Sequence, residues 1–161
     1  SRIVARDIGN IGENTAKIHM RDGKLLPNIR YQAGEFDYFY ETDHLGRLKE
    51  FKTDKLQLTE RTERLKHNPD TPGKLSTDHS GHLAADRFGG SPELDNLVSQ
   101  SAKVNLSEYR KLENRWAQAI QEGKNVKVEV KVLYRMDDPR PSGFDVRYEI
   151  DGRKFHQNIS Q

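Results

Sequence analysis

Alternating apolar and polar residues predict a run of β-strands in the last third of the chain. From 126 to 132 every second residue is valine, and charged residues stand between the valines. This period of two is typical of a strand with one buried face, and we extend the predicted strand to 126–135. Residues 144–150 and 153–159 repeat the pattern, and Asp151-Gly152 between them favours a tight hairpin turn. Three consecutive antiparallel strands are therefore predicted here.

The first half of the chain carries shorter strand patterns. Aromatic and aliphatic residues alternate with polar ones over 29–32, 36–41, 48–51 and 55–58, and weaker signals lie over 3–5 and 17–20. The segment D-H-L-G-R (43–47) has turn chemistry, because its glycine can take a positive φ. An antiparallel meander is the predicted arrangement.

A single strong helix pattern follows a middle region that is mainly loop. Residues 59–77 are charged and interrupted by two prolines, 79–85 are predicted to be a strand end that runs into a loop, and 86–104 show no clear period. Over 106–121 apolar residues recur three or four apart, which predicts an amphipathic helix, and Gly123 follows as a C-terminal cap. The order of strands, loop, helix and strands predicts an α+β fold with an antiparallel sheet.

The composition fits one heavily solvated domain, residues 1–161. The chain is 33% hydrophobic and 32% charged, with no cysteine and a net charge of +2. It can bury a real core and has no disulfide or thiolate metal site. No apolar run reaches membrane-spanning length, so no membrane partner is expected. The chain starts at Ser1 rather than Met, from which we expect a C-terminal fragment of a longer protein.

Residues with possible catalytic chemistry cluster in D-H-S-G-H-L-A-A-D-R-F-G-G (78–90) and in the predicted helix. His82 is a candidate general base, because an unperturbed histidine pKa of about 6.5 lies near working pH. Asn105 and Glu113 offer oxygen ligands, which suit a hard cation such as Mg²⁺ better than zinc. A metal ion, a histidine and a nearby cation are enough to hydrolyse a phosphodiester.

Each of these residues also has an ordinary structural interpretation. A single histidine such as His82 is more often a surface or hydrogen-bonded residue than a base. Asn105 begins a good helix-capping pattern, N-L-S-E, and capping is its more frequent role on pattern alone. Glu113 could be a solvated helix residue. A zinc site made from Asp78, His79 and His82 would lack a second cluster of ligands.

Five short motifs, taken together, resemble one nuclease family over roughly residues 38–120. They are Y-x-T-D-x-x-G-R (40–47), D-x-x-G-H-L (78–83), F-G-G (88–90), N-L-V-x-Q (96–100) and an asparagine followed eight residues later by glutamate (105 and 113). This combination resembles the DNA/RNA non-specific endonucleases with a ββα-metal site. In particular, it resembles the branch found as C-terminal toxin domains of secreted polymorphic toxins, including type VII secretion effectors.

The resemblance implies a role for each matching residue. It makes His82 the general base, Asn105 the direct protein ligand of one Mg²⁺ ion, and Glu113 the holder of a metal-bound water. Asn96 matches an active-site asparagine that orients the site through hydrogen bonds.

One position departs from the family pattern. Many relatives carry an arginine two residues before the histidine, where this chain has Ser80. Which residue supplies the cation that binds the substrate phosphate is therefore an open question. Arg87 and Arg47 are the candidate substitutes. Ser80 itself is expected to face the substrate.

The resemblance also implies partners and a setting. The expected substrate is DNA, with RNA as an additional candidate, and the expected products carry 5′-phosphates. A secreted effector that acts in the target-cell cytoplasm would need an immunity protein in the producer, and we expect that protein to be acidic. Two alternatives stay open on the residues alone: a catalytically silent nucleic-acid-binding module, and a domain that binds a protein partner.

The spacing of Asn105 and Glu113 conflicts with a shared metal site in a regular helix. Eight residues separate their Cα atoms by about 12 Å, and their faces differ by about 80°. Both side chains could serve one ion only through an intervening water or a departure from regular helix geometry.

Overall fold

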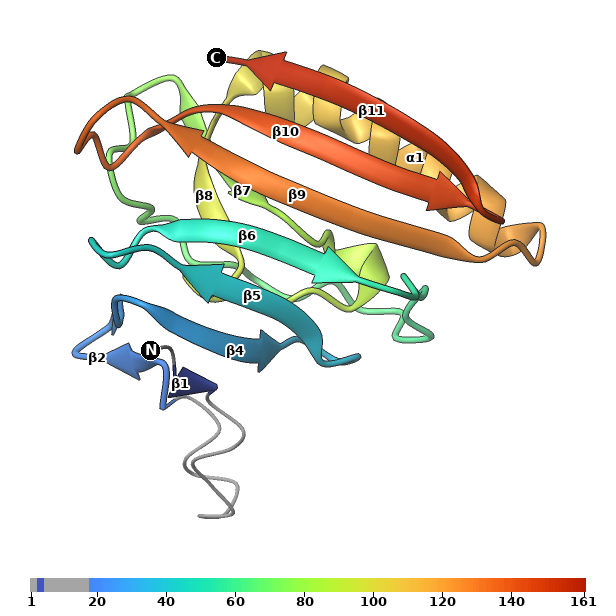
Figure 1. Cartoon of the computed structure of the whole chain (residues 1–161), viewed down its shortest axis with the longest axis horizontal. Coiled ribbons are helices and arrows are strands. Elements are labelled where there is room, and N and C mark those ends of the chain that lie inside the picture. The colour runs from blue at the N-terminus through green and yellow to red at the C-terminus, as the bar shows by residue number, and fades with distance from the viewer. Residues whose placement is uncertain (1–2, 5–17) are drawn as a thin grey trace.

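A seven-stranded sheet forms one layer of the molecule (Figure 1). The computed structural model describes residues 3–4, as backbone only, and 18–161. In spatial order the strands are β1 (Ile3–Val4), β4 (Ile29–Ala33), β5 (Tyr38–Thr42), β6 (Leu48–Thr53), β9 (Val126–Tyr134), β10 (Pro141–Ile150) and β11 (Arg153–Ser160). β1 pairs with β4 in parallel, and every other pairing is antiparallel. Part of each weak N-terminal strand prediction, Ala5 and Lys17, lies outside the described residues.

A hairpin and a helix form the second layer, on one face of the sheet (Figure 1). The hairpin pairs β7 (Asp78–His82) with β8 (Leu97–Ser101), and a short 3-10 helix, η2 (Asp86–Phe88), lies in its connection. A π-helical turn, η3 (Val104–Glu108), then runs directly into α1 (Tyr109–Gln121). A small separate hairpin pairs β2 (Met20–Arg21) with β3 (Lys24–Leu25). The predicted α+β fold, an antiparallel sheet with one long helix, is confirmed.

The core lies between the two layers because the apolar faces predicted for the strands and the helix meet there. The alternate valines of β9 are all buried. Trp116 of α1 packs edge-on against Tyr148 of β10, with ring centroids 5.6 Å apart. Tyr109 stacks on Phe144 at 6.1 Å. These contacts fix the helix against β10 and so set which of its faces remains open.

One strand prediction and one loop prediction in the middle of the chain are wrong. Residues 55–58 leave the sheet after Thr53, whose hydroxyl accepts a hydrogen bond from the Lys55 backbone N–H and so turns the chain. Residues 97–101, predicted to be loop, form β8 instead. Four of the five β8 residues are buried, including Ser99 and Gln100. A strand buried on both faces shows no polar–apolar alternation, which explains why the pattern was missed.

The predicted turns and the predicted helix end are confirmed, whereas the helix start is not. Gly46, Gly123 and Gly152 take the positive φ that their turn and cap positions need, at 78°, 80° and 83°. The helical backbone already includes Lys103, at φ −60° and ψ −45°. Asn105 therefore lies inside the helix, and the helix-capping interpretation of Asn105 is wrong. In the described part of the chain, no helix combines the length and apolar character needed to cross a membrane.

Candidate active site

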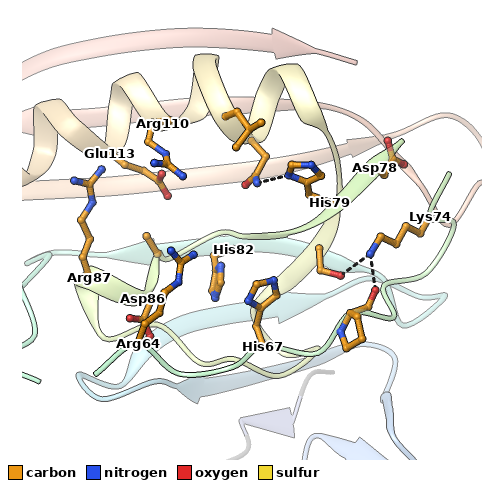
Figure 2. A pocket seen from close by; sticks show the side chains of 15 residues that line it. Arg64, His67, Lys74, Asp78, His79, His82, Asp86, Arg87, Arg110 and Glu113 are labelled. Carbon is orange, nitrogen blue, oxygen red and sulfur yellow. Dashed lines mark hydrogen bonds between the residues drawn. The ribbon is translucent and has the colours of Figure 1, made fainter. Parts of the chain in front are cut away.

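A cleft of about 730 Å³ lies between the helix and the loop that precedes β7 (Figure 2). The loop supplies one wall, β7 and the residues after it supply the floor, and η3 and α1 supply the other wall. The polar and charged residues that line the cleft are Arg64, His67, Lys74, Asp78, His79, Ser80, His82, Asp86, Arg87, Asn105, Arg110 and Glu113. The cleft thus gathers most of the residues that the motifs singled out.

His82 lies on the cleft floor as a neutral, unpartnered imidazole. It is the last residue of β7, is half-buried, and forms no hydrogen bond with any described residue. Burial, reinforced by the electrostatic effect of His67 and Arg64, lowers the pKa of His82 to about 4. A neutral imidazole that lines a cleft and forms no hydrogen bond can accept a proton.

The loop over residues 59–77 contributes residues that sequence reasoning missed. His67 approaches His82 edge-on, with ring centroids 4.9 Å apart. Burial lowers the pKa of His67, and the charges of Arg64 and Lys74 reinforce that shift. The only sequence signal for these residues was the high density of basic residues in a segment without hydrophobic periodicity. Basic residues in a loop do not reveal which surface of the protein they will face.

The π turn resolves the conflict between Asn105 and Glu113. A π turn holds one residue more than an α turn. The eight steps from Asn105 to Glu113 therefore rotate the chain about as far as seven α-helical steps, which ends within about 20° of two full turns. Both side chains consequently line the same cleft. A single extra residue in one turn is what allows one helix to present both groups to one site.

His79 holds the Asn105 side chain in place. The Asn105 amide lies 2.9 Å from His79, Nδ2 to Nδ1, so the imidazole nitrogen accepts a hydrogen bond from the amide (Figure 2). The strand alternation of β7 separates His79 from His82, which lies on the opposite face of the strand. The two histidines of the motif therefore have different surroundings.

Glu113 is a buried carboxyl at the opposite end of the cleft from Lys74 (Figure 2). Burial raises the pKa of Glu113 to about 7, and the nearby charges of Arg87 and Arg110 only partly oppose that shift. Among the described residues none forms a hydrogen bond or ion pair with its carboxyl group. A buried carboxylate without a counterion is unfavourable, and a bound cation would relieve that cost.

The oxygen donors of the cleft fit a hard divalent cation. The bond to His79 uses the Nδ2 of Asn105 and leaves its Oδ1 available, and Glu113 adds a carboxylate that lacks a cation. Carboxylate and amide oxygens with several waters are the ligands that Mg²⁺ favours. Over residues 18–161 no group of three or more His, Cys, Asp or Glu side chains is arranged to hold a metal ion.

Asn96 supports the site from within the core rather than from the cleft. It is fully buried at 0% exposure. Its Oδ1 accepts hydrogen bonds from the Tyr40 hydroxyl and the Ala84 backbone N–H, and its Nδ2 donates to the carbonyls of Ala84 and Ser91. Asn96 thus fixes the chain two residues after His82. These bonds agree with the expected role of an asparagine that orients the site through hydrogen bonds, and its side chain does not itself line the cleft.

The two arginines proposed to replace the missing cation lie away from Ser80. Arg87 donates a hydrogen bond to Asn114 at 2.6 Å and lies at the Glu113 end of the cleft (Figure 2). Arg47 is outside the cleft: its Nε pairs with Asp43 at 2.8 Å, and its guanidinium lies 4.2 Å from the centre of the Tyr134 ring. Arg47 is therefore a structural residue, and the expectation that it binds substrate is wrong.

The charges of the cleft are arranged to leave it electropositive. Two of its three acidic residues, Asp78 and Asp86, pair with cations from outside the cleft lining, Arg140 and Arg61. The cleft's own cations, by contrast, form no ion pair with any described residue; they are Arg64, Lys74, Arg87 and Arg110. Such a cleft attracts polyanions.

Comparisons with known proteins agree with this fold. The family model for DNA/RNA non-specific endonucleases matches residues 27–152. The chain is 38% identical over 157 residues to the type VII secretion system protein EssD of Staphylococcus aureus strains USA300 and NCTC 8325. That match covers 92% of this chain and 25% of EssD, so the chain spans about a quarter of the length of these relatives.

Solved nuclease structures share the fold. NucA from Streptococcus agalactiae with magnesium bound matches with a TM-score of 0.61 at 17% identity, over 89% of this chain and 77% of NucA. Sda1 nuclease with a bound zinc ion matches with a TM-score of 0.58 at 14% identity, over 76% of this chain and 74% of Sda1. The resemblance inferred from the motifs is thereby confirmed. On the match over residues 27–152, the chain belongs to the DNA/RNA non-specific endonuclease family.

Proposed function

We propose that this domain is a metal-dependent endonuclease that hydrolyses phosphodiester bonds of DNA, and also of RNA, with little sequence preference. One observation carries the proposal: His82 presents a neutral, unpartnered imidazole on the floor of an electropositive cleft, with Asn105 and Glu113 on the facing helix. Family membership supplies the reaction class.

In the proposed reaction His82 is the general base. Its imidazole takes a proton from a water molecule, whose oxygen attacks the phosphorus atom as the bond to the 3′-oxygen breaks. The 3′-oxygen then takes up a proton, and the products are a 5′-phosphate and a 3′-hydroxyl. A base with a folded-state pKa well below 7 is almost fully deprotonated at neutral pH, so His82 is ready to accept the proton without a prior ionisation step.

Asn105 and Glu113 would hold one divalent cation, which we take to be Mg²⁺. Asn105 Oδ1 is the proposed direct ligand, and Glu113 acts through water. When bound, the ion supplies positive charge that stabilises the leaving oxygen. Arg87, held by Asn114 beside Glu113, is proposed to balance negative charge at that end of the cleft.

Plasmid cleavage tests the base and the metal separately. The domain is incubated with supercoiled plasmid and with single-stranded RNA, with Mg²⁺ or with EDTA. Wild-type protein should cleave only with the metal, and His82→Ala should lose at least about 100-fold in rate, the lower bound for a general base. His44→Ala, at an exposed turn outside the cleft, is the matched control. Cleavage by His82→Ala at the wild-type rate would refute the role of His82, and cleavage in EDTA would refute the metal requirement.

We also propose that the domain acts as an antibacterial toxin, within a secreted effector that works in the target-cell cytoplasm. The similarity to EssD, a type VII secretion system protein, supports the secretion route. An acidic immunity protein that covers the electropositive cleft would protect the producer. The test is induced expression of the domain in a bacterial cytoplasm: wild type should stop growth and degrade DNA, and His82→Ala should do neither. Normal growth with intact DNA while wild-type domain accumulates would contradict the toxin role.

A further inference from the structure

Lys74 places a positive charge beside Ser80, an uncharged residue of β7. Its Nζ donates hydrogen bonds to the Ser80 hydroxyl at 3.3 Å and to the Pro69 carbonyl at 2.6 Å (Figure 2). Ser80 lies on β7 two positions before His82, the proposed base. A lysine from the preceding loop therefore brings its charge to the strand that carries the base.

The charge of Lys74 is not neutralised by its neighbours. Both acceptors of its hydrogen bonds are uncharged oxygens, and an ammonium group has three donors, so one N–H remains. Asp78, an acidic residue close enough to feel its charge, is held by two hydrogen bonds from Arg140, at 2.7 and 2.9 Å. No described carboxylate forms an ion pair with Lys74. Its charge also reaches the cleft interior, because it contributes to the lowered pKa of His67.

The backbone that carries Lys74 is held firmly although the side chain is exposed. The Pro72 carbonyl accepts a hydrogen bond from the hydroxyl of the fully buried Ser99 at 2.7 Å. Gly73 packs so closely on Arg140 that an added Cβ would lie 2.5 Å from the Arg140 backbone nitrogen. The base of the side chain is thus fixed, and a fixed base loses less entropy when the ammonium group binds a ligand.

Strand geometry puts Ser80, which Lys74 contacts, on the same face of β7 as the base. Ser80 and His82 are two residues apart on β7, so both side chains project from the same face of the strand, about 6.6 Å apart along it. The ammonium bound to Ser80 is therefore on the His82 face. Arg87, by contrast, is engaged with Asn114 at the Glu113 end.

We propose that Lys74 is the phosphate-binding cation of this site, and that it holds a non-bridging oxygen of the scissile phosphate from the Ser80 side of the cleft. The inference rests on the proposed nuclease function for the identity of the phosphate. The Ser80 hydroxyl orients the ammonium and adds a second donor. Lysine serves this role as a point charge, without the two-pronged geometry of arginine.

Binding and cleavage measured separately test this role. Lys74→Gln removes the charge, Lys74→Arg keeps it, and Lys55→Gln removes an exposed lysine outside the cleft. Binding of a fluorescent duplex is measured in EDTA at several salt concentrations. Lys74→Gln should weaken binding and lower the slope of log K against log salt by about 0.9, the value for one phosphate contact. Lys74→Arg and Lys55→Gln should keep the wild-type response to within about half of that change.

Cleavage under single-turnover conditions, with protein in excess over plasmid and Mg²⁺ present, gives the second readout. Loss of one charge-assisted hydrogen bond to the reacting phosphate should slow Lys74→Gln by about 10- to 100-fold. Lys74→Arg should retain most of the rate. Thermal melts check that each variant is folded, which is expected because the Lys74 side chain is exposed.

The outcomes separate this inference from the proposed function. If wild type cleaves and Lys74→Gln cleaves and binds equally well, Lys74 is not the phosphate cation and the nuclease proposal stands. If wild type never cleaves but binding depends on Lys74, the nuclease proposal fails and the phosphate contact stands. If Lys74→Gln loses binding and Lys74→Arg loses it equally, the role is steric, and the inference is overturned.

Discussion

At the scale of single residues, burial sets the ionisation of the two groups that face the cleft from β7 and from α1. It lowers the pKa of His82 to about 4 and raises the pKa of Glu113 to about 7. In both cases the low-polarity surroundings disfavour the charged form. The same desolvation thus keeps a base neutral and leaves a carboxylate in need of a cation.

Replacing Glu113 with glutamine should stabilise the metal-free protein, and more so at high pH. A carboxyl whose pKa rises from 4.5 to about 7 on folding binds more protons when folded between those values, so wild type loses stability as pH rises through that window. The glutamine side chain does not ionise, so its contribution to stability does not change over this pH range. From pH 5 to pH 8 the advantage of Glu113→Gln should grow by about 2 kcal/mol, measured by urea denaturation in EDTA. Glu60→Gln is the exposed control, and an advantage that does not change with pH would contradict the prediction.

Replacing Asn96 with alanine should destabilise the fold strongly. Four hydrogen bonds end on its buried amide, from Tyr40 and Ala84 and to Ala84 and Ser91. Their loss leaves buried polar groups without partners, at about 1–3 kcal/mol each, so we expect at least about 3 kcal/mol in all. Urea denaturation measures the loss in free energy of unfolding for Asn96→Ala. The control is Asn158→Ala, at an exposed asparagine on β11. A loss as small as that of the control would show that the bonds do not stabilise the fold.

The motif residues could be predicted at this scale, whereas their neighbours could not. His82, Asn105 and Glu113 were found because the family spacing survives in this chain. Lys74 and His67 come from a loop without any period, and their approach to β7 depends on loop packing, such as the bond between Pro72 and Ser99. Sequence patterns report local conformation, and these contacts are not local.

At the scale of elements, the π turn is the feature that makes the site possible. The pattern over 106–121 predicted a regular helix and therefore a conflict between Asn105 and Glu113. A π turn leaves the apolar stripe of α1 intact, because Leu112 and Trp116 lie beyond it, so periodicity could not reveal it. Like other π turns at functional sites, it gives the helix a shared face that regular α-helical geometry does not offer.

The β7–β8 hairpin depends on a close contact that allows only glycine. A Cβ on Gly81 would lie 2.0 Å from Oε1 of Gln100, whose side chain is fully buried. Gly81→Ala should therefore destabilise the protein by about 1–3 kcal/mol through overpacking. The double variant Gly81→Ala, Gln100→Ala should recover part of that loss in thermal melts, because it frees the space that the new methyl needs. A double variant less stable than Gly81→Ala alone would show that the clash is not with Gln100.

At the scale of the whole molecule, the two layers are joined at one end by polar contacts as well as by the core. The Gln161 side chain bonds Ser101 and Ser99 of β8 and the Pro141 carbonyl of β10. Arg140, in the loop between β9 and β10, holds Asp78 at the start of β7. These ties position the strand that carries Ser80 and His82 relative to the sheet.

Breaking the Arg140 tie should therefore weaken the entire fold. The Asp78 side chain is 1% exposed, so Arg140→Met leaves a buried carboxylate without its cation, which costs about 3 kcal/mol. Trp116, the single tryptophan, lies between helix and sheet. Its fluorescence and the far-UV circular dichroism should lose their signals at the same, lower urea concentration, because both layers share one core.

Adding Asp78→Asn to Arg140→Met should restore part of the stability, since a neutral amide needs no counterion. Separate transitions in the two signals would mean that the layers unfold independently, and a double variant no better than Arg140→Met would mean that Asp78 is not the source of the loss.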